Sequence, residues 1–159
     1  MTDAANVIIR THVQVERAFA AFDRAEGSRT AAYRAMLGIS DALAAHTTLE
    51  QELLWPAVQD LTGRHDHEIA RQLEVSHLLD VVLVELGTMT PADRRFAAKI
   101  EVALDLFRAH VRDTELHLLP ELRRRLDDDE AGRLGAELAE RGRRLADGPK
   151  ALAPALATR

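Results

Sequence analysis

The fold of this chain is decided by the stretch His46-Thr-Thr-Leu-Glu50-Gln-Glu-Leu-Leu-Trp55-Pro56, which has an imperfect copy in His110-Val-Arg-Asp-Thr-Glu115-Leu-His-Leu-Leu-Pro120. In both stretches a histidine is followed by a carboxylate four or five residues later and by a proline ten residues later. Residues four apart lie on one face of a helix, so His46 and Glu50 can direct an imidazole and a carboxylate at one point. The two stretches therefore predict a metal site that is built from helices.

The length and composition limit the class of protein. A chain of 159 residues fits one domain, which we expect over residues 1–147, with a frayed tail at residues 148–159. Hydrophobic residues make up 47% and charged residues 30%, which excludes a disordered chain. No apolar run approaches the roughly 18 residues that cross a bilayer, and the amino terminus does not resemble a signal peptide. We expect a cytoplasmic protein that does not bind membranes.

The charge and the absence of cysteine limit the possible partners and cofactors. The formal net charge of −5 argues against nucleic-acid binding. Without cysteine the chain has no disulfide, no thiolate ligand and no iron–sulfur cluster. Any metal must therefore be held by nitrogen and oxygen atoms.

Apolar residues recur at alternating steps of three and four along several segments, and no segment has the alternation of a strand. The pattern predicts long helices over residues 4–25, 30–61, 66–86 and 90–126, followed by a short helix over residues 127–145. On the third segment the predicted inward stripe is Ala70, Leu73, His77, Val81 and Val84. The fold class is therefore expected to be all-α, an antiparallel up-and-down four-helix bundle with a short C-terminal fifth helix.

Two prolines predict irregular turns beside the two carboxylates. Pro56 has no N–H for the carbonyl of Glu52, and Pro120 has none for the carbonyl of Leu116. Glu115 lies five residues after His110, which is about 140° around an ideal helix. A bulged turn in this region would bring Glu115 to the side of the histidine.

Each predicted long helix carries one histidine within its apolar stripe. In an up-and-down bundle the midpoints of the helices meet at one level of the core. Four buried imidazoles and two carboxylates at that level would be costly unless a cation gathered them. The sequence therefore predicts a shared metal site, whose candidate ligands are His12, His46, Glu50, His77, His110 and Glu115.

The pattern of these residues resembles the hemerythrin-like family, also known as the HHE cation-binding domain, over roughly residues 4–127. The resemblance rests on a histidine on each helix, on a His-x-x-x-Glu with a downstream proline, and on a second histidine and carboxylate on the fourth helix. It implies a non-haem centre of two iron ions, bridged by Glu50 and Glu115 and an oxygen species. The four histidines would be the terminal ligands.

One position departs from the oxygen-carrying members, which have a second histidine one turn before that of the third helix. In this alignment the equivalent residue is Leu73, which cannot bind a metal. The open position would be filled by water, by a substrate, or by a nearby carboxylate such as Glu16 or Glu74. An open position is typical of catalytic metal sites, so the departure favours redox chemistry over oxygen storage.

Two functional hypotheses follow, and the sequence leaves both open. The first is a redox enzyme that uses dioxygen or peroxide, with or without a small-molecule substrate. Glu16 and Glu74 would then be candidate proton donors, and no catalytic residue is assigned. The second is a protein that binds or senses dioxygen, nitric oxide or iron without turnover.

Three further interpretations are weaker. A ferritin-like carboxylate site needs two Glu-x-x-His motifs, and only Glu74 with His77 provides one. Zinc accepts the same imidazole and carboxylate ligands as iron. A metal-free bundle that binds a protein partner would require the buried histidines to satisfy one another.

Overall fold

The computed structural model describes residues 3–25, 27–62 and 67–148, and the fold class is all-α, with no strand in these ranges. The helices form five rods. The first is α1 (Ala4–Asp23), and the second is α2 (Arg29–Leu49), the π-helical turn η1 (Glu50–Leu54) and α3 (Trp55–Thr62). The third is α4 (His67–Gly87), and the fourth is α5 (Phe96–Asp113), the π-helical turn η2 (Thr114–Leu118) and α6 (Leu119–Arg125). The fifth is α7 (Asp128–Asp147). The predicted tail beyond Gly148 lies outside the described residues.

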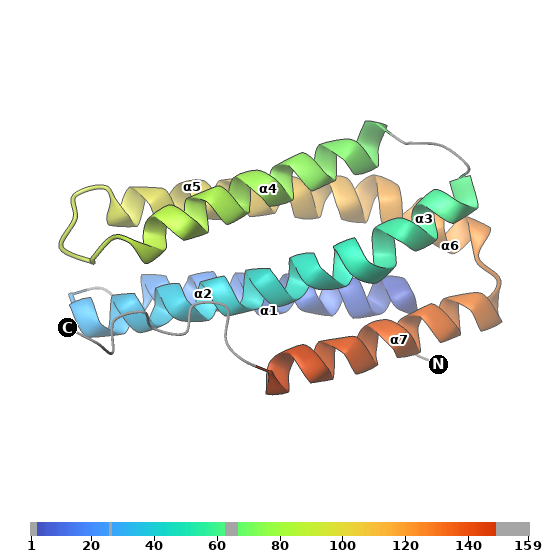
Figure 1. Cartoon of the computed structure of the whole chain (residues 1–159), viewed down its shortest axis with the longest axis horizontal. Helices are drawn as coiled ribbons and strands as arrows, with labels where there is room; N and C mark the ends of the chain where they lie inside the picture. Colours follow the sequence, from blue (N-terminus) through green and yellow to red (C-terminus); the bar gives the residue numbers. More distant parts are fainter. Residues whose placement is uncertain (1–2, 26, 63–66, 149–159) are drawn as a thin grey trace.

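The rods are arranged as two pairs with one additional helix. Contacts are most extensive between α1 and α2 and between α4 and α5, while α7 packs on α1 and α2. Figure 1 shows α7 on one side of the α1 and α2 pair, and α4 and α5 on the opposite side. Consequently α1 and α2 are covered on both sides, whereas α4 has an open outer face.

The predicted fifth helix is confirmed as α7, but it is not short, because it has 20 residues, as many as α1. Asp127 accepts a hydrogen bond from the backbone N–H of Glu130, whose side chain accepts one from the backbone N–H of Asp127. This capping box fixes the start of the helix. Its apolar stripe enters the core through Leu138, which is fully buried.

The apolar core consists of two clusters separated by a polar layer. One cluster contains Ile8, Leu49, Ile69 and Leu118, and the other contains residues such as Val15, Leu43, Leu79 and Phe107. On α1, α2 and α5 the polar layer falls where histidines replace apolar residues of the stripe. The predicted stripes of these three helices are confirmed near the layer by the burial of the histidines and their apolar neighbours.

The predicted stripe of the third helix is wrong. Its members Ala70, Leu73, His77, Val81 and Val84 are all exposed. The buried residues are instead Ile69, Gln72, Ser76, Leu79, Leu83 and Leu86. Apolar side chains line α4 on two sides, and a prediction from periodicity alone chose the outer side.

No helix in the described ranges is long and apolar enough to span a bilayer.

Candidate metal centre

Four buried side chains from three of the rods converge in the polar layer. His12 comes from α1, His46 and Glu50 from the second rod, and His110 from α5. One potential ligand atom from each lies within 4.8 Å of those of the other three. None of the four residues is more than 2% exposed. Phe107 packs against the three imidazole rings, with centroid distances of 5.6 to 6.1 Å, and keeps that side of the group apolar.

The two π-helical turns place the carboxylates, and they confirm the predicted irregularity. In the first turn the Trp55 N–H bonds to the Glu50 carbonyl, and in the second the Leu119 N–H bonds to the Thr114 carbonyl. Each turn ends two residues before a proline, which lacks the N–H that a regular helix would need. The wider turn at η2 brings Glu115 to α1, where its Oε1 lies 2.7 Å from Nδ1 of His12.

Hydrogen bonds at Nδ1 fix the tautomers of His46 and His110. The Thr11 hydroxyl donates to the Ile8 carbonyl at 2.7 Å, so at 2.9 Å from Nδ1 of His46 it acts as the acceptor. The side-chain oxygen of Gln72 accepts from Nδ1 of His110 at 2.8 Å. Both rings therefore carry their proton on Nδ1, and both Nε2 atoms present a lone pair. These two Nε2 atoms are only 3.0 Å apart.

His12 also carries its proton on Nδ1. Its Nδ1–H donates to Glu115, and its Nε2 is buried without a hydrogen-bond partner. Both carboxylate oxygens of Glu50 are also buried without a hydrogen-bond partner. Three imidazole lone pairs and one carboxylate thus face one another with no proton between them.

This donor set fits a metal ion. Unpaired buried acceptors cost free energy, and a cation among them would satisfy all of them at once. Histidine nitrogen and carboxylate oxygen bind iron and zinc at about 2.0 to 2.2 Å, a distance that small side-chain movements would reach from the observed cluster. Nδ1–H bonds to a hydroxyl, an amide or a carboxylate are the outer contacts that orient metal-bound histidines.

The protonation states also suit metal binding. Burial lowers the pKa of His46 to about 3, because a charged ring would be cut off from water. Burial lowers the pKa of His12 as well, although the hydrogen bond with Glu115 opposes the shift. Burial raises the pKa of Glu50, but His46 and His110 together outweigh it, and the net shift is downward. Neutral rings and an ionised carboxylate are the forms that bind metals.

The metal-free protein should lose stability as the pH falls below 6.5. Between pH 6.5 and about 3 the unfolded chain protonates His46 and the folded chain does not, so each added proton favours unfolding. At about pH 4.5 this one residue should cost about 2 to 3 kcal/mol relative to pH 7. Urea unfolding in the presence of EDTA at both values measures it. The His46→Gln variant should lose this part of the pH dependence, whereas variant His77→Gln, changed at an exposed ring, should retain it. Equal pH dependence in both variants would contradict the assignment.

Thr11 positions His46 and should affect metal binding without touching the metal. Variant Thr11→Val removes the acceptor of the Nδ1 proton at nearly constant volume, so metal affinity should fall by about 10 to 100-fold. Competition with a chelator measures the change. Thr47→Val is the matched control, because Thr47 is a buried threonine of α2 whose hydroxyl bonds only to the backbone carbonyls of Leu43 and Ala44. An equal loss in both variants would show a packing effect only.

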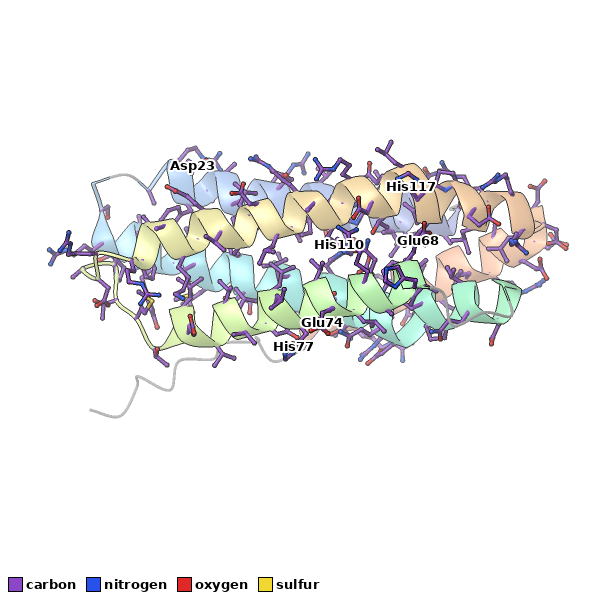
Figure 2. The ribbon with its side chains drawn as sticks, turned by 90° about the horizontal axis from the view of Figure 1, so that it is seen from above. Asp23, Glu68, Glu74, His77, His110 and His117 are labelled. Atoms are coloured by element: carbon purple, nitrogen blue, oxygen red, sulfur yellow. The ribbon has the colours of Figure 1, made fainter. Side chains whose placement is uncertain are left out.

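Three predicted residues are not brought to the cluster. His77 and Glu74 are exposed, and Figure 2 shows both on the outer side of α4, whereas His110 lies between α4 and α5. Glu16 forms a bidentate ion pair with Arg108 of α5. The prediction that His77 lies on the inward apolar stripe is wrong, because α4 has apolar side chains on two sides and His77 lies on the outer one. Neither Glu16 nor Glu74 is positioned to donate a proton to the centre.

Glu115 is brought to the cluster, although its role in the structure differs from the predicted one. Its side chain is 35% exposed and holds Nδ1 of His12, so it connects a buried ring to the surface. The bridging role that the resemblance implies would require its carboxylate to turn toward Nε2 of the ring.

The sequence reasoning missed the residues that hold the rings. Nothing in the sequence indicated a role for Thr11 except its position next to His12. Gln72 and Ser76 are spaced four apart and face inward on α4, so they occupy the place that had been assigned to Leu73 and His77. The departure from the family is therefore larger than the sequence indicated, because an amide and a hydroxyl stand where the resemblance expects imidazoles.

Comparisons with known proteins agree with this site. The chain is similar in structure to a hemerythrin HHE cation-binding domain-containing protein from Mycobacterium kansasii, with a TM-score of 0.80 and 18% identity, over 92% of this chain and 89% of the other. A comparison with the curated proteins gave no match. The family model of the hemerythrin HHE cation-binding domain matches residues 3–122, and this range contains the whole of the cluster. The chain therefore belongs to the hemerythrin HHE cation-binding domain family.

Proposed function

We propose that this protein binds two iron ions within an antiparallel helical bundle and reacts there with dioxygen or peroxide. The single observation that carries the proposal is the convergence of three unprotonated Nε2 atoms on a buried carboxylate whose oxygens have no hydrogen-bond partner. Such a group is stable in a protein interior when cations complete it.

Glu50 supports two ions, because its oxygens face different rings. Oε2 lies 3.5 Å from Nε2 of His46, and Oε1 lies 3.2 Å from Nε2 of His110. A carboxylate that offers one oxygen to each side can bridge two metals. We assign His12 and His46 to one ion, His110 to the other and Glu50 to both. We assign Glu115 to orienting His12 through Nδ1.

The ion beside His110 would have few nitrogen ligands. Helix α4 offers only Gln72 and Ser76 on its inner face, and the oxygen of Gln72 already accepts the Nδ1–H of His110. Positions left to water or to an added ligand are typical of reactive metal sites. Bound iron would supply one-electron steps and a place for a small oxidant. Phe107 and the buried rings exclude water from the other sides.

The alternative is a protein that binds or senses dioxygen, nitric oxide or iron without turnover. The placement of the acids favours it, because Glu16 and Glu52 are held in surface ion pairs with Arg108 and Arg141 and Glu74 is exposed. Among the candidate acids that have access to solvent, Glu115 is then the one nearest to the cluster. A site with few proton donors suits reversible binding better than peroxide turnover.

Metal analysis tests the proposal first. Protein loaded with ferrous iron without oxygen should retain about two irons per chain after desalting, and it should develop near-ultraviolet absorption on oxidation. One zinc ion or no metal would contradict it. Mixing the reduced protein with oxygen then separates the two functions. An absorption change that vacuum reverses indicates a carrier, whereas conversion to the ferric form with repeated consumption of peroxide indicates a redox enzyme.

A further inference from the structure

The hydroxyl group of Thr114 is buried and has no hydrogen-bond partner. The residue is fully buried, and its Oγ1 is one of the few buried polar side-chain atoms without a partner in the described ranges. The others are three atoms of His12 and Glu50, which belong to the cluster, and the indole nitrogen of Trp55. A buried hydroxyl without a partner costs free energy, so a ligand that pairs with it would be stabilised.

Other buried hydroxyl groups on the helices are satisfied by the backbone. Those of Thr11, Ser40 and Thr47 donate to carbonyls of the preceding turn, at 2.7, 3.1 and 3.1 Å. This is a common arrangement for serine and threonine inside a helix. The Thr114 hydroxyl makes no such bond, so it is available to donate to a group in the interior.

The position of Thr114 in its rod corresponds to that of Glu50. Each of the two residues comes four after a histidine of the cluster, and its backbone N–H bonds to the carbonyl of that histidine. Each is also the first residue of a π-helical turn. Both residues therefore lie on the same helix face as their histidine, one turn further along. One rod thus has a carboxylate where the other has a hydroxyl.

The two rods bring these positions to one level of the interior. Figure 1 shows that α2 with α3 and α5 with α6 run in the same direction. The Nε2 atoms of His46 and His110 are 3.0 Å apart, so the next turns of the two rods lie at a similar height along the bundle. At that height Glu50 reaches His110, with Oε1 3.2 Å from Nε2. Thr114 therefore lies at the level of Glu50, on the rod that carries His110.

We propose that Thr114 donates a hydrogen bond to a small anion, such as hydroperoxide or azide, that binds at the open position beside His110. This role rests on the proposed function, because the metal would hold the anion there. The imidazole N–H groups of the cluster are already bonded to Thr11, Gln72 and Glu115, so the rings have no donor for such a ligand. A neutral hydroxyl supplies the donor without adding a charge to the interior.

Azide binding to the iron-loaded ferric protein tests this donor. Variant Thr114→Val keeps the branched shape and removes the hydroxyl. Its azide affinity should fall by about 10 to 100-fold, while its iron content stays at the wild-type level. Variant Thr114→Ser retains a hydroxyl and should recover most of the affinity. The infrared stretching frequency of bound azide should shift in Thr114→Val and return in Thr114→Ser, which a change in packing alone would not produce.

Thr47→Val is the matched control, because it removes a buried hydroxyl that already bonds to backbone carbonyls. It should bind azide as the wild type does. Equal azide affinity and frequency in Thr114→Val and the wild type, or loss of iron from Thr114→Val, would overturn the role of Thr114 and leave the proposed function standing. A wild type that binds no iron would overturn both.

The metal-free protein gives a second readout of the unpaired hydroxyl. In the presence of EDTA, Thr114→Val should melt about 2 to 4 °C higher than the wild type, because a buried polar group without a partner is removed. Thr47→Val should show no such gain, because its hydroxyl is paired. An unchanged or lower melting temperature of Thr114→Val would overturn the premise that this hydroxyl is unpaired, and with it the proposed donor.

Discussion

Replacing Glu50 by glutamine should abolish iron binding and stabilise the metal-free protein. The carboxylate is fully buried, and neither of its oxygens has a hydrogen-bond partner. Without the charge, iron content should fall below about one tenth of the wild-type value. The amide that replaces it can donate to the lone pairs of His46 and His110, so unfolding of the metal-free protein should cost about 1 to 4 kcal/mol more. Metal analysis and urea unfolding with EDTA measure the two effects.

Glu52→Gln is the control for this experiment. Glu52 lies in the same π-helical turn, but it is exposed and pairs with Arg141 of α7. Its replacement should leave the iron content unchanged and alter the free energy of unfolding by less than about 1 kcal/mol. Full iron content in the Glu50→Gln variant would refute the central role of this carboxylate. Destabilisation of the metal-free Glu50→Gln variant would show that other interactions compensate the buried carboxylate of Glu50.

Replacing Gln72 by histidine should weaken iron binding. The side-chain oxygen of Gln72 accepts the Nδ1–H of His110 from the inner face of α4, so it lies on the side of that ring away from Nε2. A histidine has no such oxygen, and a ring nitrogen that accepted the Nδ1–H in its place would have no lone pair left for a metal. Affinity for the ion beside His110 should fall by about 10 to 100-fold, as expected when the outer contact of a metal-bound histidine is lost. Chelator competition measures the change.

Leu73→His is the matched control, because it places the same ring one residue further along α4. Leu73 is 39% exposed on the outer face, so this variant should bind iron and react as the wild type does. If Leu73→His changes the iron affinity and Gln72→His does not, then α4 is rotated in the metal-bound protein. That result would restore the alignment in which His77 is a ligand.

Three helices of the site could be predicted because each has one apolar stripe. On α1, α2 and α5 the polar outer face is distinct from the inner one, so His12, His46 and His110 were placed inward by periodicity alone. Glu50 followed from the four-residue spacing, and the prolines indicated the irregular turns that carry both carboxylates. The ends of the fifth helix were predicted to within two residues, but its packing on α1 and α2 was not, because its charged sequence gave no measure of how closely it packs.

The sequence by itself determined an all-helical protein with a candidate metal site, because buried histidine and glutamate at core positions of amphipathic helices are costly without a cation. Only the tertiary structure decided which face of α4 points inward. Apolar residues line both faces of that helix, so the choice depends on packing against α5 and α2 and not on hydrophobicity. The tertiary structure also decided the hydrogen bonds at Nδ1, because Thr11 and His46, or Gln72 and His110, are distant in sequence and meet only when the rods pack.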